Sequence, residues 1–316
     1  MADRLQLRLR KRQVPVGLLA RQATEATTSR PGLVPRRPAK VYGRIGNLEV
    51  RLATGWRDVK RAQRLRYNVF YEEMSAKAGR LAEMRRLDLD PFDAICDHLL
   101  VVDTTRTESV LPMAVAPKAR VVGTYRVLRQ EVAERRQGFY TGGEYDIAPL
   151  LAAKSHLRFL EVGRSCVLKP YRNKRTVELL WHGLWTFIRE QKADVLIGCA
   201  SFPGTDPATH AMALSFLHHN ALAPLEWRCR AHQGRYVPMD ILDKAELDPK
   251  QALKGMPPLI KAYLRLGAYV GEGAVVDTQF ATTDVMIILP VSRIDPRYFE
   301  HFGAPDEVKS RVALDA

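Results

Sequence analysis

Short runs of alternating apolar and polar residues mark the first half of the chain. Residues 41–54 (VYGRIGNLEVRLAT) alternate as a half-buried strand does, and residues 56–79 carry apolar side chains at helical spacing. Two further runs, at residues 98–103 and 119–129, are apolar and rich in valine, and a loop that contains proline separates them. The pattern therefore predicts a strand, a helix and then two strands.

The second half of the chain alternates between predicted strands and predicted helices. Residues 194–202 (DVLIGCASF) form a nearly continuous apolar run, as expected of an interior strand beside a crossover helix. The elements predicted here are a strand, a helix, a strand, two helices and a closing strand, at residues 158–168, 176–190, 194–202, 206–220, 257–271 and 282–291. This order predicts an α/β (α+β) fold with a mixed sheet. No GxGxxG motif follows the first strand, which disfavours a dinucleotide-binding fold.

The composition is that of a globular protein that buries a full core. The chain has 316 residues, 46% of them hydrophobic, and no apolar run approaches the roughly 20 residues needed to span a bilayer. Arginines interrupt the apolar positions of the N-terminus where a signal peptide needs a clean apolar core, so we expect a cytoplasmic protein. The four cysteines are far apart and form no CxxC pair, so we expect buried thiols and no zinc site: Cys96, Cys166, Cys199 and Cys229.

The net charge of +14 favours anionic partners, and much of it lies near the N-terminus. Residues 1–40 hold ten Lys and Arg against two acids, together with four prolines. This composition predicts a basic, mostly disordered tail at residues 1–38 that contacts an anionic membrane surface; a merely solubilising tail is the alternative. Nucleic-acid binding is disfavoured, because the basic residues concentrate in this tail and the rest shows no helix-turn-helix, zinc-finger or stacked-aromatic motif.

A cluster of cations precedes the helix predicted at residues 176–190. The strand at 158–168 runs into YRNKRT, and a helix N-terminus adds unpaired backbone N–H groups to Arg172, Lys174 and Arg175. The pattern predicts a site for a phosphate or a pyrophosphate; a solvated basic turn is the alternative.

Two charged residues, Glu161 and Arg164, lie on the same predicted strand. They are three apart, so a regular strand places them on opposite faces, but a bulge, which Gly163 permits, turns both toward one cleft. An ordinary network of ion pairs is the alternative. Further candidates for the cleft are Arg126, Asp90 and Asp93.

Several motifs together resemble the ornithine-acyl carrier protein N-acyltransferases, the first enzymes of ornithine lipid synthesis. They include LRYNVFYEEM, LDLDPFDAICDHLLVVD, LEVGRSCVLKPYRNKR and YLRLGAYVGEGAVVDTQFATTDVMIILP. The resemblance covers roughly residues 42–302 and implies an acyltransferase domain at residues 39–302, followed by a C-terminal tail at residues 303–316.

A more distant resemblance connects the chain with the acyl-homoserine-lactone synthases. It is carried by the residue types and spacing of Arg66, Phe70, Asp90, Asp93, Arg126, Glu161 and Arg164. It implies a splayed, mixed sheet of the Gcn5-related N-acyltransferase kind. A tryptophan that those synthases carry shortly after the Phe70 position is absent here, where Met74 stands nearby, which puts the acceptor in doubt.

The resemblance also implies a mechanism and partners. The α-amine of L-ornithine attacks the thioester of a 3-hydroxyacyl chain on acyl carrier protein, whose 4′-phosphopantetheine phosphate meets Arg172, Lys174 and Arg175; no tightly bound cofactor and no metal are expected. Glu161 is the expected base or water-positioning group, with backbone N–H groups of residues 163–166 at the oxyanion. Arg126 and Arg164 are expected to bind the ornithine carboxylate or to fix Glu161. The expected substrate-binding residues are Arg66, Phe70, Asp90 and Asp93, of which Asp90 and Asp93 bind an ammonium group or order their loop with Arg66.

Other functions remain open at this point. An acyl-homoserine-lactone synthase or another N-acyl amino acid synthase keeps the fold and changes the acceptor. A non-catalytic protein that binds membranes or nucleic acid is the alternative from another class. The expected location is the cytoplasm, with peripheral contact at the inner membrane.

Overall fold

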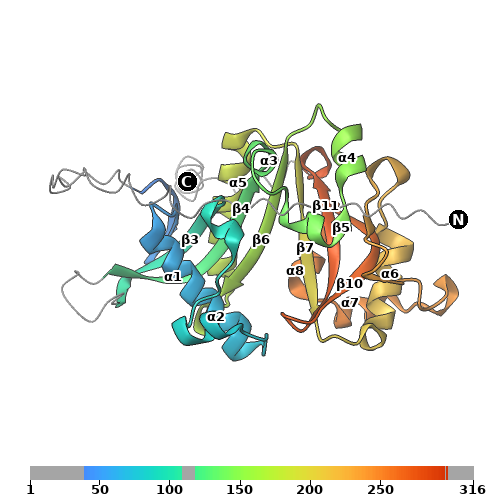
Figure 1. Ribbon diagram of the computed structural model, residues 1–316, viewed down its shortest axis with the longest axis horizontal. Coiled ribbons are helices and arrows are strands. Elements are labelled where there is room, and N and C mark those ends of the chain that lie inside the picture. Colours follow the sequence, from blue (N-terminus) through green and yellow to red (C-terminus); the bar gives the residue numbers. More distant parts are fainter. Residues whose placement is uncertain (1–38, 109–117, 296, 298–316) are drawn as a thin grey trace, which may run out of the picture. The chain divides into compact units, whose positions relative to one another are not determined.

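The computed structural model describes residues 39–108, 118–295 and 297 (Figure 1). The tails predicted at residues 1–38 and 303–316 lie outside these described residues, so those predictions stay predictions. None of the helices in the described part is long and apolar enough to cross a bilayer.

A mixed sheet of eleven strands runs through the described part of the chain, in the order β1-β2-β3-β4-β6-β7-β11-β10-β8-β5, with β9 beside β10. The strands are β1 (Val41–Ile45), β2 (Leu48–Leu52), β3 (Asp97–Glu108), β4 (Lys118–Arg129), β5 (Tyr145–Asp146), β6 (Phe159–Val167), β7 (Val195–Pro203), β8 (Arg230–Ala231), β9 (Tyr236–Val237), β10 (Tyr269–Asp277) and β11 (Thr282–Pro290). The α-helices are α1 (Trp56–Tyr67), α2 (Arg80–Arg85), α3 (Gln130–Glu134), α4 (Ala148–Ala153), α5 (Lys174–Gln191), α6 (Ala211–Ala221), α7 (Pro249–Gly255) and α8 (Pro258–Arg265). The mixed sheet flanked by helices confirms the predicted fold class.

The first predicted strand is a hairpin. Residues 41–54 were expected to run straight, but β1 and β2 pair antiparallel and turn between Ile45 and Leu48. Gly46 takes a left-handed φ of 58° in this turn, and a Gly-Asn pair is a favoured hairpin turn. The prediction of one strand was therefore wrong, because alternation continues through both arms of a hairpin and conceals a two-residue turn.

Helices α1 and α5 cover opposite faces of the β1–β6 half of the sheet (Figure 1). Helix α5 begins at an N-cap, Asn173, whose side chain accepts a hydrogen bond from the Thr176 N–H at 3.1 Å. It buries Leu180, Leu184 and Ile188 against β1–β4. Each such side chain contributes about 1.5–3 kcal/mol when fully buried, so packing on the sheet fixes the position of the α5 N-terminus.

The chain after α1 continues as one π-helical segment, η1 (Asn68–Glu73). Val69 is buried in the core, and Phe70 packs edge-to-face on Phe280 with ring centroids 5.8 Å apart. π-Helical turns are rare and occur often at functional sites.

Strands β6 and β7 pair in parallel over a short stretch and then diverge. Their register joins Phe159 to Val195 and ends with Glu161 opposite Ile197. Beyond it, Gly198 approaches the β6 backbone so closely that a Cβ atom would overlap the carbonyl oxygen of Val162. Glycine is needed at this point of divergence, since only a residue without a side chain fits there.

The C-terminal half pairs β7, β11 and β10 antiparallel. The strand predicted at residues 282–291 is confirmed as β11, which is buried along its whole length. The helix predicted at residues 257–271 is only half right, because α8 ends at Arg265 and β10 begins at Tyr269. Gly267, with a left-handed φ of 87°, follows the end of α8 and redirects the chain.

Candidate active site

A cavity of about 340 Å³ opens where β6 and β7 diverge. Both strands line it along residues 161–167 and 196–201, and β11 closes it on the far side through Asp284 and Ile287. Its apolar walls include Phe70, Met74 and Tyr263. The cavity is therefore bounded by backbone edges on two sides and by apolar side chains on others, which suits a ligand with a polar head and an apolar chain.

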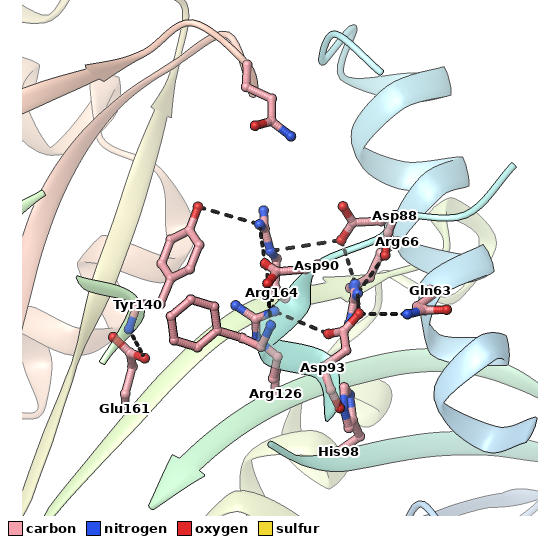
Figure 2. A network of polar contacts seen from close by, with 12 residues as sticks. Gln63, Arg66, Asp88, Asp90, Asp93, His98, Arg126, Tyr140, Glu161 and Arg164 are labelled. Carbon is pink, nitrogen blue, oxygen red and sulfur yellow. Dashed lines mark hydrogen bonds and ion pairs between the residues drawn. The ribbon is translucent and has the colours of Figure 1, made fainter. Parts of the chain in front are cut away.

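A buried network of arginines and aspartates lies beside this cavity (Figure 2). Arg66, on α1, is 0% exposed; its Nε lies 2.7 Å from Oδ2 of Asp88 and its Nη2 lies 2.5 Å from Oδ2 of Asp93. Gln63 donates to the same Asp93 oxygen at 2.9 Å, and the Tyr71 hydroxyl donates to Asp88 at 3.0 Å. These contacts tie the loop after α2 to α1 and to the π-helical segment.

The network continues onto the sheet through Arg126 and Arg164. Asp90 accepts from both, with its Oδ2 2.9 Å from Nη1 of Arg126 and 2.8 Å from Nη2 of Arg164. Arg126 also contacts Asp93 at 3.2 Å. Burial alone raises the pKa of Asp90, but the charges of Arg126 and Arg164 outweigh it and lower the pKa to about 2.

The charges of this network balance. Three arginines face three aspartates, and all are buried except Asp90 and Arg164, which are partly buried: Arg66, Arg126, Arg164, Asp88, Asp90 and Asp93. Removing one partner of a buried pair destabilises a protein by about 3–5 kcal/mol. The network thus fixes the Asp88–Asp93 loop and the guanidinium of Arg164. This rigidity is expected both of an ordinary ion-pair network and of a substrate site, so it does not distinguish between them.

Arg164 occupies an unusual backbone position. Its φ is 51°, and the β4–β6 register slips between the pairs Arg126–Gly163 and Thr124–Cys166, which is a β-bulge. The predicted bulge is therefore present, but the left-handed residue is Arg164 and not Gly163. Such a conformation costs an ordinary residue about 1–2 kcal/mol. The side chain stacks over Phe280 at 4.1 Å from the ring centroid and over Tyr140 at 5.2 Å, which holds it against the cavity.

Glu161 shares the cavity with Arg164, as the sequence predicted, but its carboxylate is engaged with the backbone. It accepts from the N–H groups of Tyr140 at 2.8 Å and Thr141 at 2.6 Å, at the start of η3 (Tyr140–Gly143). Burial raises the pKa of Glu161, and these donors oppose the rise. Its carboxylate therefore fixes the η3 loop, and its predicted role as a base stays a prediction.

The three predicted phosphate-binding cations separate in space. Arg172 lines the cavity, where it pairs with Glu73 at 2.5 Å and donates to the Val167 carbonyl at 2.8 Å. Lys174 is exposed and lies 3.5 Å from Glu178 on the same helix. Arg175 donates to the Ile45 carbonyl in the β1–β2 turn. Of the three, the geometry brings only Arg172 to the cavity.

Three carboxylates gather at the β10–β11 side of the cavity. Glu144, Asp277 and Asp284 each place an oxygen within 4.8 Å of the others, and Asp277 and Asp284 line the cavity. Burial and the charge of Asp284 raise the pKa of Glu144 to about 7, and burial raises the pKa of Asp284. No other group of three or more acids, histidines or cysteines among the described residues is arranged to hold a cation.

Cys166, one of three cysteines that line the cavity, is not poised as a nucleophile. Cys166 is buried in β6 and lines the cavity, and burial raises the pKa of its thiol. A thiol is reactive as its thiolate, so this environment favours direct transfer over an acyl-enzyme. All four cysteines are free thiols, buried or partly buried, which confirms the prediction that they pack in the interior.

Comparison with known families adds to this geometry. Residues 65–182 match the acetyltransferase (GNAT) domain. Over 288 residues the chain is 49% identical to the L-ornithine N(alpha)-acyltransferase of Brucella abortus (strain 2308), covering 91% of this chain and 97% of that one. Over 264 residues it is 50% identical to the enzyme of that name from Rhizobium meliloti (strain 1021), covering 84% of this chain and 87% of that one. The chain belongs to the L-ornithine N(alpha)-acyltransferase family.

Among solved structures, this member of the L-ornithine N(alpha)-acyltransferase family is similar to FeeM, an N-acyl amino acid synthase from uncultured soil microbes. The TM-score is 0.41 at 12% identity, and the match covers 78% of this chain and 91% of that one.

Several residues of the site in this L-ornithine N(alpha)-acyltransferase family member were not singled out from the sequence. Asp88, Asp277 and Asp284 fall inside motifs that carried the family resemblance, but their spacing gave no reason to select them. Tyr140 and Glu144 lie in a glycine-rich loop with no strand or helix pattern, so the sequence offered no signal for them.

The raised pKa of Glu144 predicts a pH dependence of stability. A carboxyl whose folded pKa lies above its unfolded value binds more protons when folded, so the free energy of unfolding falls as pH rises from about 4.5 to about 7. In Glu144→Gln this contribution is absent. The difference in unfolding free energy between wild type and variant should change by up to about 3 kcal/mol across this window, measured by urea denaturation at pH 4.5, 6, 7 and 8. Glu272→Gln, on β10 and paired with Arg230, is the control; a difference that does not vary with pH would contradict the assignment.

Proposed function

We propose that this chain transfers a 3-hydroxyacyl group from acyl carrier protein to the α-amine of L-ornithine and forms a lyso-ornithine lipid. Membership of the L-ornithine N(alpha)-acyltransferase family supports the reaction class and the acceptor. The observation that carries the proposal is the cavity between β6 and β7, which opens onto backbone edges and onto the arginine–aspartate network.

The donor enters between the diverging strands in this proposal. Arg172 stands at the cavity, close in sequence to the N-terminus of α5, where a single phosphate of 4′-phosphopantetheine finds a guanidinium and unpaired backbone N–H groups. The apolar wall of Phe70, Met74 and Tyr263 receives the acyl chain. The net charge of +14 attracts the acidic carrier protein to the enzyme.

The chemical step needs little help from a base. The lone pair of the α-amine attacks the thioester carbonyl, the new C–N bond forms, the C–S bond breaks, and the amine proton leaves as the thiol is released. An α-amine has a pKa of about 8, so modest assistance makes it nucleophilic at neutral pH. We assign that assistance to Glu161, directly or through water. The backbone around the bulge at Arg164 supplies N–H groups for the oxyanion, since a bulge leaves a residue out of the ladder.

The reaction is tested by incubating the purified protein with 3-hydroxyacyl carrier protein and a panel of amines. The expected product is N-(3-hydroxyacyl)ornithine, detected by mass spectrometry, with 3-hydroxyacyl-coenzyme A a poorer donor. Transfer to S-adenosylmethionine or to other amino acids, with ornithine ignored, would instead favour a lactone synthase or another N-acyl amino acid synthase. Absence of transfer to any amine would sink the proposal.

Arg172 provides a separate test of the donor route. Arg172→Ala should raise the KM for the acyl carrier protein substrate about tenfold and leave kcat within about threefold, because it removes one charge-assisted hydrogen bond to the phosphate. Arg189→Ala, near the other end of α5, removes an exposed arginine and should change neither constant. An unchanged KM in Arg172→Ala would place the phosphate elsewhere.

We also propose that the basic residues of the N-terminal segment bring the enzyme to the anionic inner membrane. The ten Lys and Arg of residues 1–40 support this contact, and so does the lysolipid nature of the product. Deleting residues 1–38 should abolish co-sedimentation with anionic vesicles while RNA binding is absent in both proteins. Retained vesicle binding after the deletion would remove the role of this segment.

A further inference from the structure

The acids at the β10–β11 side of the cavity are not neutralised by an equal number of cations, as the aspartates of the arginine–aspartate network are. Glu144 and Asp284 are 4% and 7% exposed, and they lie within 4.8 Å of Asp277. Among the described residues Arg235 forms the ion pair with this cluster, with its Nη2 3.5 Å from Oε1 of Glu144, and the charge of Arg164 only partly opposes the raised pKa of Asp284. Buried like charges at this separation repel, so the cluster is incomplete without a further cation.

Two oxygens of the cluster also lack hydrogen bonds. Oε2 of Glu144 and Oδ1 of Asp284 are buried and have no hydrogen-bond partner of good geometry among the described residues. The hydroxyls of Ser201 and Thr282 lower the pKa of Asp284, and the Cys199 thiol lowers the pKa of Glu144. These effects are smaller than the rise in pKa that burial causes. Buried polar atoms without partners are rare, so these two oxygens indicate an absent donor.

The position of the third acid is set by the backbone. Oδ1 of Asp277 accepts from the N–H groups of Gln279 at 2.7 Å and Phe280 at 2.9 Å, in the turn between β10 and β11. Phe280 in turn stacks under the guanidinium of Arg164. Asp277 is therefore built into the same wall of the cavity that holds Arg164.

We propose that Glu144, Asp277 and Asp284 bind the side-chain ammonium of the acceptor and thereby select a diamino acid over amino acids with apolar side chains. This inference rests on the proposed function. An ammonium group offers three N–H donors and one positive charge, which match two unpaired oxygens and an excess of negative charge. Asp284 and Glu161 line the same cavity, so the acid cluster and the divergence of β6 and β7 face one ligand site.

The test compares ornithine with norvaline, which has the same carbon skeleton and no side-chain ammonium. For the wild type, kcat/KM should favour ornithine by at least about 100-fold, because norvaline leaves the buried acids without a donor. Asp284→Asn should lower kcat/KM for ornithine about 10- to 100-fold, chiefly through KM, and change the value for norvaline by less than about threefold. Asp277→Asn, which keeps the Oδ1 acceptor of the turn, should act in the same direction.

The control is Glu272→Gln, which removes a carboxylate from β10 that already has its own partners, Arg230 at 3.1 Å and Arg228 at 4.0 Å. It should leave the ornithine–norvaline ratio unchanged. Folding is checked independently: without acceptor, Asp284→Asn removes like-charge repulsion, so its Tm should equal or exceed that of the wild type.

The outcomes separate this inference from the proposed function. Transfer to neither amino acid by the wild type refutes the function. Efficient transfer to ornithine with equal use of norvaline, or a parallel loss for both amino acids in Asp284→Asn, refutes the ammonium site and leaves the function intact. Loss of activity in EDTA with recovery on adding Mg²⁺ or Ca²⁺ also refutes it, since the carboxylates then hold a divalent cation.

Discussion

The pairing of β6 with β7 ends after Glu161 and Ile197, and the site depends on that short ladder. Strands that stayed paired would leave no space for a ligand between them. Gly198 places the two backbones in contact at the end of the ladder, and the bulge at Arg164 turns the next part of β6 away from regular pairing with β4. Backbone N–H groups and side chains from both strands are thereby exposed to one cavity, while the surrounding sheet stays continuous.

Charge is distributed on the two sides of this cavity in different ways. On the α1 side, three arginines and three aspartates neutralise one another, so the loop that contains Asp90 and Asp93 is held rigidly and the side chain of Arg164 is fixed. On the β10–β11 side, the carboxylates outnumber the cations beside them. A network with balanced charges is suited to positioning, because its charges need no further partner. An unbalanced one is suited to binding, because a ligand completes it.

The sequence predicted the features that depend on neighbouring residues better than those that depend on contacts between distant segments. The strands β3, β4, β6, β7 and β11 and the helix α5 follow from local periodicity, which survives in any context. Asp90, Asp93, Arg126 and Arg164 were candidates for one cleft from their places in the sequence, and the family resemblance added Arg66. Their contacts depend on pairing between distant segments. Glu144 was out of reach, since a lone acid in a glycine-rich loop has no pattern until β10 and β11 bring Asp277 and Asp284 beside it. Local signals also failed where glycine interrupts them, as at the hairpin turn of Gly46 and at the start of β10 after Gly267.

The strongest departures from ordinary structural preference coincide in space. Among the described residues with left-handed φ other than glycine, Arg164 alone lies inside a strand, and the others lie in turns or at helix ends. Two of the three acids on the β10–β11 side, Glu144 and Asp284, are buried, and the three acids outnumber the cations beside them. Both features lower stability. A core selected for stability alone would have an extended residue at position 164 and apolar residues in place of the acids. Because both face the cavity between β6 and β7, and because the rest of the sheet is well paired and apolar, the destabilising features are confined to the place where a substrate compensates for them on binding.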